Sequence, residues 1–225
     1  MPRAGKNVRI LAFRRRSKAM QFFLATGVLL VLPIGLYWLA QQLLVTVRLA
    51  NAATIAPLVF WLYPICLAIA GYTGYRGVYL WKRANHADQG ARAEEEIAHL
   101  LESLKPRGWQ IEYGVQDRQV GDVDVFLISP QGKAYTIDVK SHRGYVFAQQ
   151  NQLYRKLGQT TVSFEKDFLS QAKRQAVVMK ERRGLKFVTP VIVFSDATVN
   201  IMSNPIAGVH VLHRHNLLDC LRALE

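Results

Sequence analysis

The sequence predicts an α/β domain that follows a pair of membrane-spanning helices, and two observations support this fold class. Residues 20–47 and 49–75 contain no charged residue, and each run exceeds the roughly 20 apolar residues that a helix needs to cross a bilayer. From residue 90 onward, short apolar runs with period two alternate with longer amphipathic segments, which is typical of strands and helices in one domain. About 135 residues are ample for a single hydrophobic core.

The two uncharged runs predict a transmembrane hairpin over residues 20–75. A signal peptide is the alternative for the first run, but the length of that run and the second run directly after it favour the hairpin. A buried helical pair in a soluble protein is the other alternative. Neither run contains an acid, a basic residue or a histidine, the residues that usually mark a transport path. We therefore expect the hairpin to be an anchor.

The basic charge of the chain is concentrated around the hairpin. The net charge is +13, of which the first 89 residues carry +10 and the remainder only +3. The tail of residues 1–19 holds seven basic residues and no acid, whereas the connection between the runs holds only Arg48. Basic residues near helix ends stay cytoplasmic, so both termini are predicted inside, with a small external turn near residues 45–53. The same charges suit anionic lipid head groups, and DNA binding by the tail is a minor alternative.

A change of composition separates the hairpin from the predicted soluble domain. Residues 76–89 are polar and basic and precede Gly90, so they are predicted to form a linker before a domain over residues 90–225. The chain has two cysteines, Cys66 and Cys220, and no CxxC pair. A zinc site or a disulfide framework is therefore not supported.

The predicted domain begins with a helix and continues with a mixture of strands and helices. The first helix covers residues 91–108 and is expected to end at Pro106 and Gly108. Residues 144–164 suggest a hairpin or short strands. The remaining predicted elements are strands over 109–115, 123–129, 133–140, 187–196 and 208–213, and helices over 165–184 and 215–225.

Acids and a lysine lie on two neighbouring predicted strands, in GDVDVFLIS and TIDVK. Asp122 and Asp124 share one face of the first strand because strand side chains have period two, so Asp124 is the expected ligand and Asp122 the alternative. Asp138 and Lys140 share a face of the second strand by the same rule. Carboxylates suit Mg²⁺, and a lysine beside it can stabilise charge on a phosphate.

These motifs resemble the NERD domain, a nuclease-related branch of the PD-(D/E)xK superfamily. The resemblance implies a restriction-endonuclease-like mixed sheet flanked by helices, and a metal held by Glu94 of the first helix together with Asp124 and Asp138. A glutamine on a later helix matches Gln171, and Gln175 lies one turn further on the same face. The catalytic residues implied by the resemblance are Glu94, Asp124, Asp138, Lys140 and Gln171.

The predicted function is that of a membrane-anchored, Mg²⁺-dependent nuclease that hydrolyses DNA phosphodiester bonds at the cytoplasmic face, with Mn²⁺ as an alternative ion. The predicted partners are DNA, through the resemblance, and membrane lipids, through the two helices. The alternative is a catalytically inactive module that keeps the fold and binds nucleic acid or a protein partner at the membrane.

Other polar residues give weaker signals. Ser141 and His142 follow the lysine and either contact phosphate or form a turn. His210, His213 and His215 suggest a metal cluster, but they are distant in sequence from the acids and suit loop positions better. The sequence contains no P-loop and no glycine fingerprint for a nucleotide.

Overall fold

The computed structural model describes residues 6–47, 52–117 and 119–225. The chain divides into two compact units, one of Arg9–Asp88 and one that includes Gln89–Glu225. The division falls beside residue 90, where the sequence predicts the α/β domain to begin.

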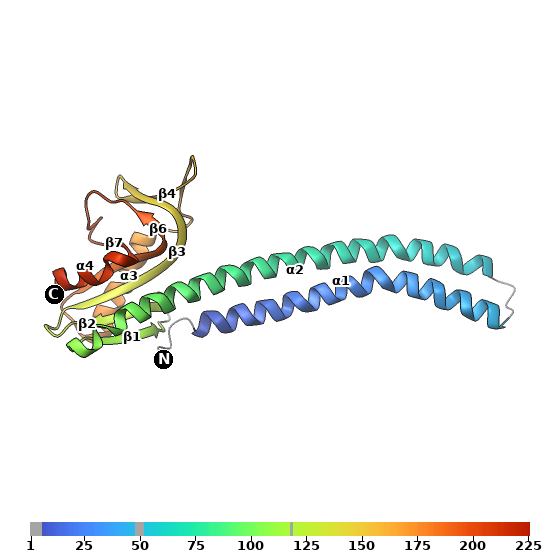
Figure 1. The fold of residues 1–225 in the computed structure, drawn as a ribbon, viewed down its shortest axis with the longest axis horizontal. Coiled ribbons are helices and arrows are strands. Elements are labelled where there is room, and N and C mark those ends of the chain that lie inside the picture. The colour runs from blue at the N-terminus through green and yellow to red at the C-terminus, as the bar shows by residue number, and fades with distance from the viewer. Residues whose placement is uncertain (1–5, 48–51, 118) are drawn as a thin grey trace. The chain divides into compact units, whose positions relative to one another are not determined.

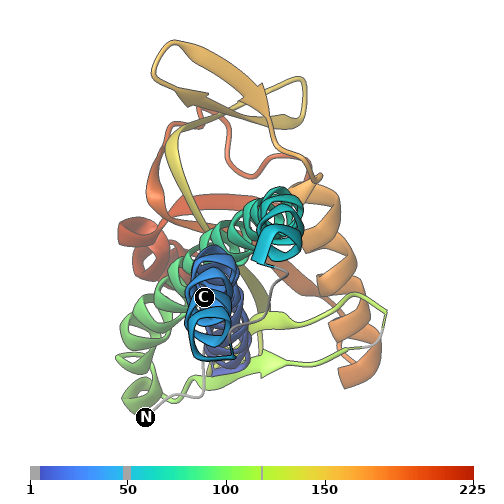
Figure 2. The same ribbon diagram turned by 90° about the vertical axis from the view of Figure 1, so that its right-hand side faces the viewer.

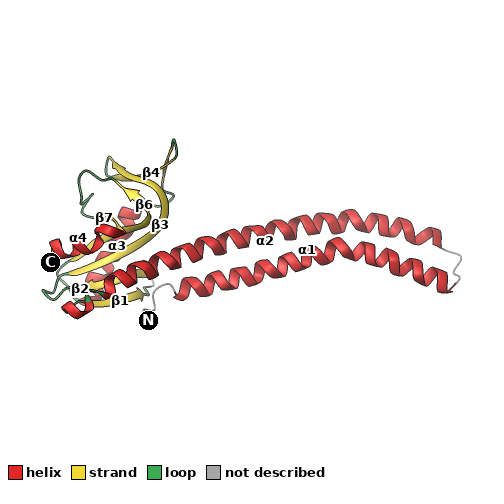
Figure 3. Ribbon diagram, in the orientation of Figure 1, coloured by secondary structure: helices red, strands yellow, loops and turns green. Residues whose placement is uncertain are grey.

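The first unit consists of two long helices that run side by side in opposite directions (Figure 3). They belong to α1 (Lys6–Val47) and α2 (Ala52–Glu102). The Oγ1 atoms of Thr26 and Thr73 are 2.8 Å apart and share a hydrogen bond. A Cβ atom at Gly77 would lie 2.6 Å from the ring of Phe23, so the glycine permits this close approach of the helices.

A polar cluster joins the two helices near the end of this unit. The Arg16 guanidinium forms an ion pair with Asp88 and donates a hydrogen bond to Asn85 at 3.1 Å. The same guanidinium lies 5.6 Å from the ring centroid of Trp81, and that ring packs against Phe23. Charged, aromatic and apolar contacts therefore follow one another along the pair, as they do at a membrane–water interface.

One helical segment among the described residues, Val8–Gln42, is long and apolar enough to cross a membrane. This finding rests on length and composition, which a signal sequence near the N-terminus also satisfies. The second predicted run includes residues 49–51 and the side chains of residues 52–60, which lie outside the described residues. The second crossing is thus a prediction that the structure leaves open.

Residues 76–89, where the sequence predicts a linker, continue α2 without a break. The segment contains no proline, and its alanines, lysine and arginines are good helix formers. The change of composition at residues 76–89 therefore does not mark the end of a helix. It lies within α2. Residues 6–19 of the basic tail are likewise helical, within α1.

A mixed sheet forms the centre of the second unit (Figure 1). Within the described residues it has seven strands, in the order β1-β2-β3-β4-β5, with β6 parallel to β3 and β7 parallel to β6. The strands are β1 (Gln110–Val115), β2 (Val123–Ile128), β3 (Ala134–Gln149), β4 (Gln152–Leu157), β5 (Thr160–Ser163), β6 (Val188–Val199) and β7 (His210–His213).

β3 is the organising strand of this sheet. It pairs with β6 along most of its length, with β2 in its first half and with β4 in its second half. The register against β6 shifts by one residue between Lys140 and Arg143, which places a β-bulge at Ser141 and His142. The strand is strongly curved, and the β4–β5 hairpin projects from its far end (Figures 1 and 2).

Helices cover both faces of the sheet (Figure 2). The last turns of α2 and the C-terminal α4 (Leu217–Leu224) pack on one face, where Ile97, Leu101 and Leu221 are fully buried. α3 (Phe168–Arg183) packs on the other face. Asp167 caps α3 by accepting the Ser170 N–H at 3.0 Å, and Gly184 ends it at φ 62°.

Most predicted elements of the α/β unit occur in the structure, with differences at their ends. The helix predicted to end at Pro106 ends at Glu102 and is followed by a 3₁₀ turn, Lys105–Arg107. The strand predicted to end at Lys140 continues to Gln149. A second 3₁₀ turn, Arg214–Asn216, precedes the final helix.

Candidate active site

Asp124 and Asp138 lie opposite each other on neighbouring strands. β2 and β3 pair in antiparallel fashion with Val125 opposite Ile137, and the same register places Asp124 opposite Asp138. Directly opposed side chains of an antiparallel pair point to the same face. The sheet therefore brings together the two acids that the sequence predicts as metal ligands.

The carboxylate of Asp124 is held by the backbone of β3. The Val139 N–H donates a hydrogen bond to Asp124 Oδ2 at 2.7 Å. Burial raises the pKa of Asp124 well above its usual range, and the neighbouring carboxylates of Asp138 and Glu94 raise it further. The Val139 hydrogen bond and the Lys140 charge act in the opposite direction. Asp124 thus lies among acidic groups that disfavour its charge.

Lys140 is fixed beside Asp138. Its Nζ lies 2.9 Å from Asp138 Oδ1 and 2.7 Å from Asp138 Oδ2, and it lies 4.5 Å from the ring centroid of Phe168 on α3. Asp138 is 3% exposed. Burial raises the pKa of Asp138, and the ion pair with Lys140 partly offsets this effect. Because Asp138 is buried, moving the Lys140 ammonium group away would leave the Asp138 carboxylate without a compensating charge.

Glu94 approaches Asp124 from α2. It is half-buried on the turn before Ile97, and it lies close enough to raise the pKa of Asp124. Its neighbour Glu96 is exposed and forms an ion pair with Arg214. The helix therefore directs Glu94 toward Asp124 and leaves Glu96 exposed beside Arg214.

Asp122 does not occupy the position of Asp124. Its side chain is exposed, at the residue before β2 begins, and its charge is not among the groups that shift the pKa of Asp124 or Asp138. Asp122 contributes its backbone instead, since its carbonyl accepts a hydrogen bond from Gln175 Nε2 at 3.2 Å.

The two glutamines of α3 have different environments. Gln171, which the resemblance selects, is half-buried. Gln175 is fully buried and supports the start of β2 through the Asp122 carbonyl. Its Oε1 atom is buried and has no hydrogen-bond partner within the described chain. The structure thus gives Gln175 a clear contact near the acids and leaves the part of Gln171 to be tested.

The sequence analysis missed Gln89, because its segment was predicted to be a linker. Gln89 Nε2 donates to the Ser141 carbonyl at 2.8 Å and to Asp196 Oδ2 at 3.1 Å. It therefore ties the β-bulge that follows Lys140 to β6. Gln89 is one polar residue among several in this segment, and its partners Ser141 and Asp196 are distant in sequence. No local pattern could therefore predict the contact.

Ser141 and His142 form the bulge and not a turn. The His142 ring packs edge-on against Phe164 at 5.2 Å and lies 5.4 Å from Phe168. Burial lowers the pKa of His142, as do the positive charges of Arg155 and Lys140. His142 is thus held neutral in an aromatic environment beside the lysine.

The remaining histidines do not form a metal centre. The rings of His213 and His215 lie 4.7 Å apart, and burial lowers the pKa of His213 and of His210. Within the described part of the chain, no three His, Cys, Asp or Glu side chains lie in an arrangement that could hold a metal ion.

The two opposed carboxylates nevertheless fit a hard divalent cation. Mg²⁺ prefers oxygen ligands, keeps several waters and is commonly held through one or two carboxylates and the phosphates of a substrate. Asp138 Oδ2 is buried and accepts no hydrogen bond from the described residues beyond its ion-pair contact with Lys140. A cation beside Asp124 and Asp138 would relieve their mutual repulsion.

Comparison with known proteins gives one family match. Residues 89–195 match the family model described as NERD, nuclease-related domain. The matched segment begins at Gln89 and includes the acids, the lysine and both glutamines of α3. A search of curated proteins and a search of solved structures each found no match. The match confirms the resemblance to the NERD domain over residues 89–195 and suggests a nuclease-related function.

Proposed function

We propose that the protein is a membrane-anchored, Mg²⁺-dependent nuclease that hydrolyses DNA phosphodiester bonds at the cytoplasmic face of the membrane. The observation that carries the proposal is the opposition of Asp124 and Asp138 beside Lys140. The match of residues 89–195 to a nuclease-related domain supports the class of reaction.

Each residue has a distinct task in this proposal. Asp124 and Asp138 would hold the cation, and Glu94 would add a third carboxylate near Asp124 from α2. The bound ion would polarise a phosphoryl oxygen and lower the pKa of water. Lys140 carries the positive charge that faces the phosphate as negative charge develops on it. The Val139 N–H keeps Asp124 in place through its 2.7 Å hydrogen bond.

The helical unit supports attachment to a membrane. Apolar side chains of α1 are widely exposed, among them Leu24 at 67%, Val31 at 65% and Trp38 at 64%. A soluble protein rarely exposes a continuous apolar surface of this kind. The segment Val8–Gln42 is long enough to cross a membrane, so we infer that lipid covers these exposed side chains. The basic residues before the apolar run favour a cytoplasmic N-terminus.

A cleavage assay on the full-length chain in lipid nanodiscs tests the proposed function. We expect cleavage of DNA with Mg²⁺ or Mn²⁺ and none with a chelator. Asp124→Asn should abolish cleavage, because it removes the charge and keeps an oxygen that can accept the Val139 N–H. Asp122→Asn is the matched control, since Asp122 is exposed and one residue outside β2.

The runner-up is an inactive module that keeps the fold and binds nucleic acid or a protein partner. The observation in its favour is that Lys140 already contacts both carboxylate oxygens of Asp138, where the proposed cation must bind. A parent protein that binds DNA and cleaves neither DNA nor RNA with either ion would favour this module over the nuclease.

A further inference from the structure

The β3–β4 ribbon has one face in the core and one face in solvent. Val146 and Leu153 point inward and are buried. The opposite face carries two cross-strand pairs, Tyr145 opposite Lys156 and Phe147 opposite Tyr154. We name this second group, Tyr145, Phe147, Tyr154 and Lys156, the aromatic face.

The rings of the aromatic face form a row. Phe147 and Tyr154 are stacked, with ring centroids 5.8 Å apart and an interplanar angle of 23°. Tyr145 lies next in the row, 6.3 Å from Phe147. Tyr145 is 37% exposed, and the other two rings are half-buried. Water therefore reaches part of each of the three rings.

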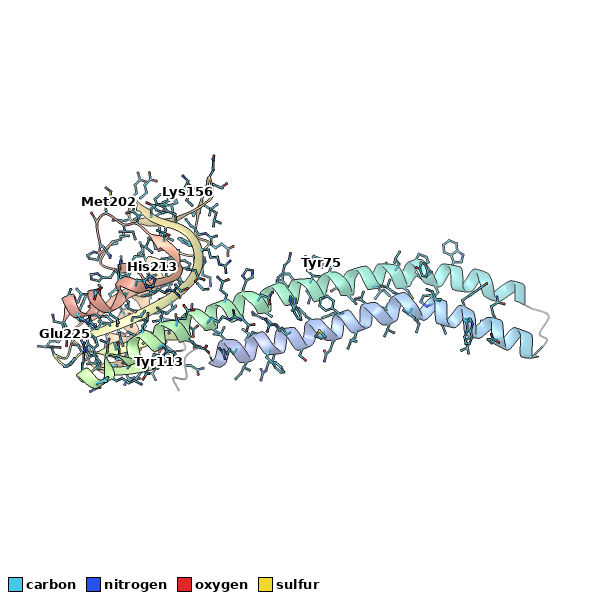
Figure 4. All side chains as sticks on the ribbon, in the orientation of Figure 1. Tyr75, Tyr113, Lys156, Met202, His213 and Glu225 are labelled. Carbon is cyan, nitrogen blue, oxygen red and sulfur yellow. The ribbon has the colours of Figure 1, made fainter. Side chains whose placement is uncertain are left out.

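A hollow of about 620 Å³ lies against two rings of this row, Tyr145 and Phe147, and Tyr154 lies outside its lining. It is bordered by Tyr145, Phe147 and Lys156 of the ribbon and by Asn200 and Met202 of the loop after β6. The Asn200 side-chain amide donates to the Tyr145 hydroxyl, and the Asn200 N–H donates to the Val146 carbonyl at 2.9 Å. Lys156 and Met202 are both labelled at the hairpin end of this unit in Figure 4.

The charge around the aromatic face has one sign. Residues 139–164 contain no acid and four basic residues. Lys156 belongs to the aromatic face and Arg143 is exposed, whereas Lys140 is paired with Asp138 and Arg155 lies opposite Val146, over the ring of Phe164. Residues 197–209, which include the loop across the hollow, are uncharged. The exposed basic residues of this part of the chain are thus Arg143 and Lys156, and their charge complements a polyanion.

We propose that the aromatic face binds an unpaired stretch of DNA, with bases stacked on Phe147 and Tyr154 and a phosphate beside Lys156. Aromatic rings combined with basic groups are the usual platform for single-stranded nucleic acid, because every base has a stacking surface. The proposal rests on the proposed nuclease function and assigns it a substrate class. β3 carries both sites, since Tyr145 follows Lys140 by five residues on the same strand.

Cross-strand aromatic pairs also stabilise a ribbon, so the test must separate binding from folding. The full-length chain in nanodiscs is titrated with a labelled oligothymidylate, with the matching DNA duplex and with oligouridylate, all in EDTA to prevent cleavage. The variant is Phe147→Val with Tyr154→Val, because valine keeps strand propensity. The control is Phe187→Val, an exposed ring at 68% that lies outside the aromatic face.

We expect the parent to bind unpaired DNA more tightly than duplex. The double variant should weaken unpaired binding by about tenfold or more, the scale of losing one stacked base. Lys156→Ala should lower the slope of log K against log salt by about one unit, whereas Lys186→Ala should not. A photo-crosslink from bromodeoxyuridine in the oligonucleotide should map to the β3–β4 ribbon. This measurement uses the parent protein, so it does not depend on the folding of a variant.

Several results would overturn the proposal: equal affinity for duplex and unpaired DNA, equal affinity of the double variant and the parent, or a crosslink outside the ribbon. Tighter binding of oligouridylate would replace DNA by RNA as the occupant. Failure of the nuclease proposal is distinguished by the separate Mg²⁺ cleavage assay. If the parent does not cleave DNA but the double variant binds unpaired DNA more weakly than the parent, the nuclease proposal fails and the binding proposal stands. If the parent cleaves DNA and the double variant binds as tightly as the parent, the binding proposal fails and the nuclease proposal stands.

Discussion

The Nζ atom of Lys140 contacts both oxygens of Asp138, at 2.9 and 2.7 Å, while the ring of Phe168 lies under the same ammonium group. Asp138 is buried, so its charge must be balanced by a cation of some kind. In the absence of a bound metal the lysine supplies that balance. In the proposed nuclease, a divalent ion bound beside Asp138 would free the lysine to face the phosphate.

The first prediction follows from this relationship. Lys140→Ala should keep the affinity for Mg²⁺ or increase it, because it removes a positive charge beside Asp138. Cleavage should fall by about 10² to 10³-fold, the usual scale for losing one electrostatic stabiliser. Isothermal titration and single-turnover kinetics on the same preparation measure the two effects. Lys173→Ala, on the exposed side of α3, is the control, and equal loss in both variants would contradict the assignment of Lys140.

A second prediction concerns the stability of the acidic pair. The pKa of Asp124 is raised in the folded chain, so the folded state binds the proton more tightly than the unfolded state. This contribution favours folding at low pH and is lost as the pH rises from the ordinary aspartate pKa through the raised one. At neutral pH, Asp124→Asn should therefore raise the metal-free Tm by about 2–4 °C, the shift that ~1 kcal/mol produces in a chain of this size.

Mg²⁺ should raise the Tm of the parent, because a ligand that binds only the folded state stabilises it. The Asp124→Asn variant should lose this rise, and Asp122→Asn should keep it. Differential scanning fluorimetry in detergent with and without Mg²⁺ provides the measurement. An Asp124→Asn variant that is less stable than the parent without metal would refute the raised pKa as the dominant effect.

The third prediction separates the two glutamines of α3. Gln175→Ala should lower stability by about 1–3 kcal/mol, since it leaves a cavity and an unpaired Asp122 carbonyl. Gln171→Ala should leave the Tm unchanged and lower cleavage at least about tenfold if this residue assists the transition state. Thermal melts and cleavage rates of both variants decide between the two positions. A larger catalytic loss at Gln175 would transfer the role proposed for Gln171 to its neighbour.

The sequence predicted the positions of the acids because strand periodicity is a local property. Asp124, Asp138 and Lys140 lie in short apolar runs whose faces follow from period two, whereas Glu94 was implied by the resemblance to the NERD domain. The pairing of β2 with β3 then required only a short turn between them. These parts of the candidate site depend on neighbours in sequence.

The length of β3 could not be predicted in this way. Gly144 suggests a break, but in the structure it allows close approach of β4: a Cβ atom there would lie 2.6 Å from the Lys156 carbonyl oxygen, and its φ is +104°. The bulge at Ser141, its support by Gln89 and the aromatic face likewise depend on partners that are distant in sequence.

The fourth prediction tests the packing of the helical pair. Thr26→Cys with Thr73→Cys should form a disulfide on mild oxidation, since the threonine oxygens are 2.8 Å apart. The background replaces Cys66 and Cys220. Gly35→Cys with Thr73→Cys is the control, because residue 35 lies about 13 Å further along α1. A mobility shift on a non-reducing gel reports the bond, and oxidation of both pairs to the same extent would argue against a fixed register.

The last prediction places the pair in the membrane. Seven basic residues precede the first apolar run, and only Arg48 stands in the connection, so the positive-inside rule puts both ends of the pair in the cytoplasm. In a chain without its native cysteines, an impermeant maleimide added to intact cells should label a cysteine at position 48, which lies outside the described residues, and should miss one at position 10. Permeabilised cells should label both.

An intact-mass measurement tests the alternative of a signal peptide. Because a signal peptide would be cleaved, the mature chain should keep its first 20 residues. A shortened chain would identify Val8–Gln42 as a signal sequence, and labelling at position 10 alone would invert the topology and place the acidic pair of Asp124 and Asp138 outside the cell.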